Sequence, residues 1–197
     1  MVKVKYTKRE VGDLLISILI LGFAFMNLIF EPTFPNYFLA LGLTVLCYFP
    51  RELIQRIYSR RMSMYSQYRI WIPGVLAGIL SSFIGFVFAA VGSIDFSLKY
   101  YERYGRKQIG ISVKQIGLAI LSGYWYSIIF GVISILIGFL GVPIFFVIAK
   151  INFYIAFFNM IPIAKLDGVK IIRWRPLLWV CLLFLSFGLL IASHFLG

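Results

Sequence analysis

Charged residues are scarce in this sequence. Only 13% of its 197 residues are Asp, Glu, Lys or Arg, whereas soluble domains carry about 25%. Hydrophobic residues make up 61% of the chain, and its mean hydropathy is +0.94. This composition excludes an ordinary cytosolic globule and a disordered tail. We therefore predict a polytopic membrane protein, whose length allows roughly six spans of about 20 residues.

Cysteine, histidine and acidic residues are also few. The two cysteines, Cys47 and Cys181, both fall inside apolar runs, which argues against the disulfide framework of a secreted domain. The single histidine, His194, lies near the C-terminus. Seven acidic residues face nineteen basic ones, giving a net charge of +12. In a chain this apolar, the excess indicates membrane topology and contact with anionic headgroups rather than nucleic-acid binding.

The long apolar runs predict where the chain spans the membrane. They cover residues 11–30, 36–50, 70–94, 116–149, 151–164 and 176–196. The run 116–149 is too long for one span. Pro143, with Gly138 and Gly141 before it, predicts a turn that divides this region into spans near 117–140 and 143–161.

Basic residues then decide the predicted topology. Eighteen of the nineteen form four clusters, namely Lys3, Lys5, Lys8 and Arg9; Arg51, Arg56, Arg60, Arg61 and Arg69; Lys99, Arg103, Arg106, Lys107 and Lys114; and Lys165, Lys170, Arg173 and Arg175. If residues 70–94 crossed the membrane once, the third and fourth clusters would lie outside, against the positive-inside tendency. A hairpin that re-enters and returns keeps all four clusters inside.

The sequence of residues 70–94 fits such a hairpin, because it contains four glycines and the Ser81-Ser82 pair near its middle. We expect an all-α, polytopic transmembrane bundle of five spans plus this re-entrant hairpin, with the N-terminus cytoplasmic. A sixth full span is the alternative. The whole chain, residues 1–197, is predicted to be one integral membrane domain.

Ionisable residues at membrane depth are the first candidates for function, because they are costly unless paired or hydrated. They are Arg51, Glu52, Asp95, Lys150 and Asp167. Arg51 and Gln55 are four residues apart, which places them on one face of a helix beside Glu52. The alternative is that this segment is only the basic, cytosolic end of a span.

A second segment, FNMIPIAKLDGVKI at 158–171, combines a helix breaker with a turn. Pro162 interrupts the apolar helix, and Gly168 follows Asp167 where the chain must turn. Asn159 and Asp167 could have only a capping role there. Lys150 could extend to a membrane interface or pair with a buried acid.

The stretch NMIPIAKLDG, from Asn159 to Gly168, resembles the Asn-x-x-Pro-x-x-x-Leu-Asp-Gly motif of the site-2 protease family. These proteins are intramembrane zinc metalloproteases, and the resemblance is to their short archaeal members. It extends over about residues 40–175, with 11–30 and 176–196 as extra spans. It implies an archaeal plasma membrane location and a zinc-ligand position at Asp167. It also implies substrate- or partner-contact positions, for which we consider Asn159, Pro162, Gly168 and Lys150.

The sequence departs from the family at its metal motif. The family pattern is His-Glu-x-x-His, in which two histidines bind zinc and the glutamate is the general base. Here the matching stretch is Arg51-Glu52-Leu53-Ile54-Gln55, which keeps the base position and replaces both histidines. Arginine cannot deprotonate to bind a metal, and a glutamine oxygen is a poor zinc ligand. The family's Gly-Pro-x-x-Asn motif corresponds to GYWYS at 123–127, without the Pro and Asn.

We therefore predict that this site is degenerate, with no catalytic residue, zinc or other cofactor at Arg51, Glu52, Gln55 and Asp167. Without a metal, two buried acids in one site cannot both ionise cheaply. We expect Arg51 to pair with Asp167 or Glu52 and to hold the site together, with Lys150 as a second candidate for this role.

The predicted function is that of an inactive site-2-protease-like membrane protein, a pseudoprotease. Its partners would be the bilayer, with anionic headgroups on the basic face, and other membrane proteins or transmembrane helices. It could form a homo-oligomer or serve as a subunit of a complex. One alternative is an active intramembrane metalloprotease with unusual ligands. A second is a small transporter or complex subunit that reuses the fold.

Overall fold

The computed structural model of the chain describes residues 6–98 and 111–196. This part contains seven helices and two strands. They are α1 (Lys8–Ile29), α2 (Phe34–Arg61), β1 (Met64–Ile70), α3 (Ile72–Ser82), β2 (Gly92–Leu98), α4 (Val113–Phe139), α5 (Ile144–Met160), α6 (Asp167–Trp174) and α7 (Pro176–His194). The predicted all-α membrane bundle is confirmed, with the addition of a two-stranded sheet that the sequence did not indicate.

Four helices, α1, α2, α4 and α7, are long and apolar enough to cross a membrane. The predicted turn at Pro143 is present, because α4 ends at Phe139 and α5 begins at Ile144. However, α5 has only 17 residues, or about 25 Å at 1.5 Å per residue, against a hydrocarbon core of about 30 Å. The predicted span at 143–161 is therefore a shorter apolar helix.

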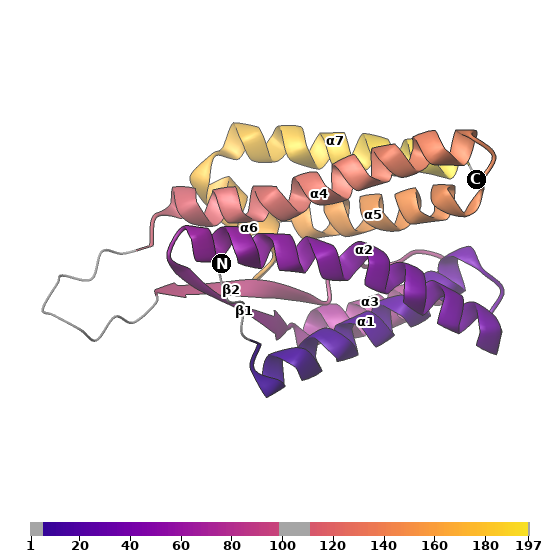
Figure 1. The fold of residues 1–197 in the computed structure, drawn as a ribbon, viewed down its shortest axis with the longest axis horizontal. Helices are drawn as coiled ribbons and strands as arrows, with labels where there is room; N and C mark the ends of the chain where they lie inside the picture. Colours follow the sequence, from indigo (N-terminus) through magenta and orange to yellow (C-terminus); the bar gives the residue numbers. More distant parts are fainter. Residues whose placement is uncertain (1–5, 99–110, 197) are drawn as a thin grey trace, which may run out of the picture.

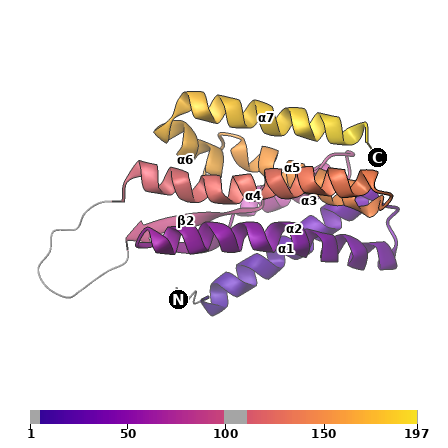
Figure 2. The same cartoon turned by 45° about the horizontal axis from the view of Figure 1, so that its top comes forward.

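The helices form two groups that lie along the long axis of the molecule (Figure 1). In one group α5 packs against both α4 and α7, and in the other α1 packs against α2 and α3. The groups meet mainly where α2 contacts α4. Figure 2 shows α2 and α4 side by side, with β2 passing close to α2.

The helix α2 continues through Pro50, beyond the predicted end of the apolar run at residue 50. A proline inside a helix has no N–H to donate, so the carbonyl of the residue four positions earlier loses its usual partner. Here the Tyr126 hydroxyl donates to the Leu46 carbonyl at 3.4 Å. A contact from α4 thus compensates for the interruption, and α2 extends to Arg61.

Most of the described basic residues gather at one end of the bundle, and Lys150 on α5 is an exception. The beginnings of α1, α4 and α7 and the end of α2 lie at the left of Figure 1, and they carry Lys8, Lys114, Arg175 and Arg61. The α1–α2 and α4–α5 connections and the end of α7 lie at the right. This separation agrees with the predicted topology. The basic residues at positions 1–5 and 99–110 lie outside the described residues, and the cytoplasmic placement of this end stays a prediction.

Residues 71–91 leave the sheet and return to it. The strands β1 and β2 pair antiparallel from Met64↔Leu98 to Ile70↔Gly92, so the segment between Ile70 and Gly92 begins and ends at one place. α3 forms the outward half, and the turn after it uses Gly85 at φ +82°. The Ser81 hydroxyl accepts a hydrogen bond from the Phe88 N–H at 2.8 Å and ties the returning chain to α3. The chain therefore forms a hairpin over these residues, and its re-entry into the membrane stays a prediction.

A buried ion pair joins α1 to α2 and β1. Glu10 pairs with Arg56, and both side chains are almost fully buried. Glu10 also accepts a hydrogen bond from the Tyr68 N–H at 2.8 Å. The Tyr68 hydroxyl bonds to Ser17 and to the Tyr48 hydroxyl, each at 2.8 Å. Neither Glu10 nor Arg56 was among the predicted ionisable residues at membrane depth, because both sit at helix ends that look solvent-accessible in sequence.

Replacement of the Glu10 carboxylate is expected to destabilise the N-terminal half. In Glu10→Gln, buried Arg56 loses the negative charge of Glu10, and the free energy of unfolding should fall by about 3 kcal/mol. The measurement is thermal unfolding in detergent. Glu31→Gln, at an exposed position in the α1–α2 connection, is the control and should have little effect. Equal shifts for the two variants would contradict this account.

Candidate functional site

The predicted site residues come together where α2, α4 and α6 meet. Arg51, Glu52 and Gln55 are on α2, and Asp167 is the first residue of α6. The four residues are 1%, 6%, 0% and 2% exposed, respectively. They therefore do not form the solvated, basic end of a span, which was the alternative interpretation of this segment.

Arg51 bridges the two acids. One guanidinium nitrogen, Nη1, donates to Glu52 Oε1, and the other, Nη2, donates to Asp167 Oδ2 at 2.9 Å. Gln55 Nε2 donates to the same Asp167 oxygen at 3.1 Å and to the Ile120 carbonyl at 3.3 Å. The expected ion pair is present, and it includes both candidate carboxylates rather than one.

A second cation, Lys170, completes this group. It lies one turn after Asp167 on α6, and its Nζ donates to Asp167 Oδ1 at 3.4 Å and to the Ile94 carbonyl of β2 at 2.8 Å. We call Arg51, Glu52, Gln55, Asp167 and Lys170 the Arg51 cluster. It contains two positive and two negative side chains, so its charges balance.

The charges around Asp167 decide its ionisation. Burial alone would raise the pKa of this carboxyl, but Lys170, Arg51 and the hydrogen bond from Gln55 together outweigh burial and hold the pKa below its usual value. Asp167 is therefore a carboxylate at neutral pH, and Arg51 and Lys170 neutralise its charge.

Two predicted ionisable candidates lie elsewhere. Lys150 is half-buried on α5, ten residues before Met160 at the end of that helix, which is about 15 Å along its axis. Lys170 has the role that Lys150 was expected to share. Asp95 is exposed on β2, opposite Gln67 of β1. In the sequence, the i, i+3 spacing of Asp167 and Lys170 on one helix was the signal that could have identified Lys170 as the partner of Asp167.

The α5–α6 connection explains the residues around Asp167. α5 ends at Met160, and Ala164 then takes a left-handed conformation at φ +49°. Gly168 lies directly against the backbone of Met160 and Ile161, and a Cβ there would overlap the Met160 carbonyl. A glycine after Asp167 thus lets α6 begin close to the end of α5, which sets the position of the carboxylate.

The other predicted contact positions differ in accessibility. Asn159 is buried, and its Nδ2 donates to the Ile155 carbonyl at 2.7 Å within α5. Pro162 is exposed in the connection. A contact role for Asn159, Pro162, Gly168 and Lys150 stays a prediction.

The GYWYS stretch packs against the cluster from α4. A Cβ at Gly123 would overlap the side chain of Gln55. The Tyr124 hydroxyl donates to the Leu182 carbonyl of α7 at 2.7 Å, and Ser127 is fully buried. Gly123 therefore leaves the space in which Gln55 can reach Asp167.

The donor set of the site does not fit a zinc ion. Zinc in proteins takes three or four ligands from Cys, His, Asp and Glu. Across residues 6–98 and 111–196, no three such side chains come together in a way that could hold a metal. Glu52 and Asp167 are separated by the guanidinium of Arg51, which stays protonated. Cys47 contacts Asn152, and His194 contacts Tyr154 near the end of α7.

Comparison with known proteins identifies one metalloprotease-like relative. The chain is 29% identical over 185 residues to a protein of Methanocaldococcus jannaschii named "putative zinc metalloprotease", and the match covers 89% of each chain. No protein-family model matches the sequence. No solved structure matches it either.

Mutation of the cluster is expected to be strongly non-additive. Arg51→Gln leaves Glu52 and Asp167 as buried acids of like charge, and Asp167→Asn removes one partner of Arg51. Each should lower the free energy of unfolding by about 3 kcal/mol, whereas the double variant should cost clearly less than the sum. Unfolding in detergent measures all three variants. Simple additivity would show that Arg51 and Asp167 do not interact.

Gly168→Ala tests the close approach of α6 to α5. The added methyl group meets backbone atoms, which cannot rotate away, and we expect a loss of about 2 kcal/mol in stability. Gly42→Ala on α2 is the matched control, because a Cβ at Gly42 has open space. Retained stability in Gly168→Ala, measured by the same unfolding assay, would contradict the packing described for this turn.

Proposed function

We propose that this protein is a site-2-protease-like membrane protein in which the Arg51 cluster replaces the metal centre, and that it binds membrane partners without cleaving them. The observation that carries this proposal is the position of Arg51. Its guanidinium joins Glu52 to Asp167 inside a buried site, where the resemblance would place the metal between these two residues.

The chemistry of hydrolysis supports this proposal. A catalytic zinc lowers the pKa of its bound water to about 7, which supplies a nucleophile at neutral pH, and it polarises the carbonyl under attack. The Arg51 cluster holds a guanidinium and an ammonium, neither of which can bind and activate water in this way. The Glu52 carboxylate, which has the position of the general base, is paired with Arg51.

The exposed apolar surface supports a role in binding other transmembrane helices. Among the four long helices, α7 has the smallest buried share, 22% of an 18-residue apolar stretch against 39–44% for the others. It presents Leu177, Phe184, Phe187 and Ile191 outward. α7 packs on α5 and α6, which leaves its other side for a membrane partner, a second copy of the chain or lipid.

We place the protein in an archaeal plasma membrane, with its basic end and N-terminus in the cytoplasm. The organism of the similar protein supports the first part. The gathering of Lys8, Arg61, Lys114 and Arg175 at one end of the bundle supports the second.

The name of the Methanocaldococcus protein favours a second candidate function, that of an active intramembrane metalloprotease. This candidate needs a metal ligand set that differs from the usual one, because Arg51 and Gln55 occupy the histidine positions. Metal content separates the two candidates directly.

We expect the purified protein to contain far less than one zinc per chain and to leave a model transmembrane peptide uncut. The double variant Arg51→His/Gln55→His restores two histidines one turn apart near Asp167, and it should bind about one zinc. Adding Asp167→Asn to this variant is the control and should weaken zinc binding. One zinc per chain in the native protein, with peptide cleavage that Glu52→Gln abolishes, would overturn the proposal.

A further inference from the structure

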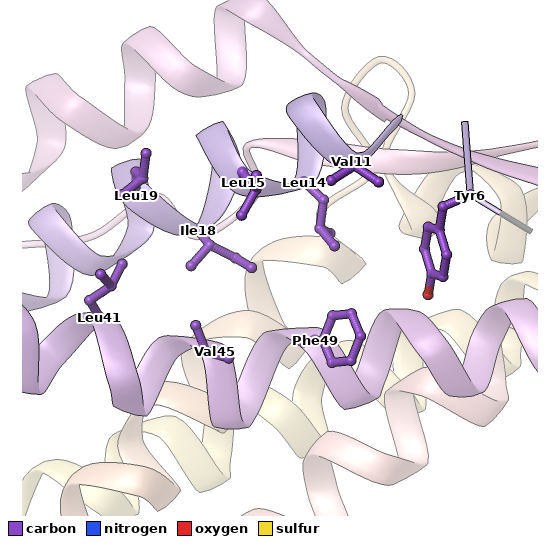
Figure 3. A pocket seen from close by; sticks show the side chains of 9 residues that line it. All are labelled: Tyr6, Val11, Leu14, Leu15, Ile18, Leu19, Leu41, Val45 and Phe49. Carbon is purple, nitrogen blue, oxygen red and sulfur yellow. The ribbon is translucent and has the colours of Figure 1, made fainter. Parts of the chain in front are cut away.

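An apolar groove runs between α1 and α2 on the outside of the bundle. It has a volume of about 580 Å³, within the usual range of about 300–1,000 Å³ for ligand sites. Its walls are the side chains of Val11, Leu14, Leu15, Ile18 and Leu19 from α1, Leu41, Val45 and Phe49 from α2, and Tyr6 (Figure 3). Figure 3 shows these side chains projecting into the space between the two helices, with the Tyr6 hydroxyl at one end of it.

The lining residues indicate what fits this groove. Helices that dock in membranes use small residues, which allow two backbones to approach closely. None of the nine lining residues is Gly, Ala or Ser, and all are branched aliphatic or aromatic. The groove is therefore better suited to a thin, flexible hydrocarbon chain than to another helix.

One end of the groove is polar and basic. Lys8 is exposed and lies three residues before Val11 and seven before Leu15, so it is on the groove face of α1. Arg56 is seven residues after Phe49 on the corresponding face of α2, and its guanidinium stacks on the Tyr6 ring at 4.1 Å from the centroid. Since Arg56 is already paired with Glu10, Lys8 is the described residue on the groove face that supplies positive charge there.

From this arrangement we infer that the α1–α2 groove binds one hydrocarbon chain of an anionic phospholipid, whose phosphate lies against Lys8. The apolar walls run along the helices from Leu19 and Leu41 toward Tyr6, so a chain in the groove leads its headgroup to the basic end of the bundle. Tyr6 lies at the boundary between the two regions, as amphipathic aromatic rings do at membrane interfaces. This inference is independent of whether the Arg51 cluster replaces a metal.

Native mass spectrometry of the full chain tests this inference. The protein is released from micelles that contain equal amounts of phosphatidylglycerol and phosphatidylcholine, and the retained lipids are counted. We expect one phosphatidylglycerol per chain in preference to phosphatidylcholine. Lys8→Ala should lower its retention about fivefold, because one basic residue contributes this much to the binding of an anionic lipid. Lys165→Ala, another exposed basic position, should leave retention unchanged.

A second pair of variants tests the groove itself. Val45→Trp fills it and should abolish retention of the lipid, whereas Val180→Trp changes a similarly exposed valine on α7 and should have no effect; the two valines are 42% and 37% exposed. Thermal unfolding of both variants checks that they are folded. Equal retention of the two lipids, or equal retention by Val45→Trp and Val180→Trp, would overturn the inference.

Discussion

The buried cation Arg51 constrains the arrangement of the elements around it. Arg51 lies deep in the bundle, where an unpaired charge would cost several kcal/mol, so two acids must come to it. Glu52 is beside it in sequence, but Asp167 is 116 residues away and lies on a separate helix, α6. Lys170 then extends the same group of charges to the backbone of β2. One electrostatic requirement thus fixes α2, α6 and the sheet relative to one another.

Close packing around this cluster is what makes the charges meet. Gly123 leaves room for Gln55 between α2 and α4, and Gly168 allows α6 to start against the carbonyl of Met160. In both places a single methyl group would push the polar groups apart. Hydrogen bonds between buried ions weaken as the paired atoms move beyond about 3 Å, so these glycines contribute to the electrostatics although they carry no charge.

The helix α2 has two functional sides. Its inner side carries Arg51 and Gln55 into the bundle, and its outer side carries Val45 and Phe49 into the apolar groove. Val45 and Phe49 are four residues apart and share one face of this helix of 28 residues. Arg51 and Gln55 are also four residues apart and share a different face. The proposed partner-binding role and the proposed lipid site therefore use different surfaces, and a change in one need not disturb the other.

The sequence by itself determined the class of the protein, the turn at Pro143, the return of residues 70–94, and the pairing of Arg51 with at least one of the two acids Glu52 and Asp167. Each depends on a local or compositional rule, such as hydrophobic length, charge sidedness or a short motif. Only the tertiary structure decided that Glu10 pairs with Arg56, that Lys170 rather than Lys150 faces Asp167, and that β1 pairs with β2. These contacts depend on how distant segments are oriented, and no periodicity within one segment specifies that.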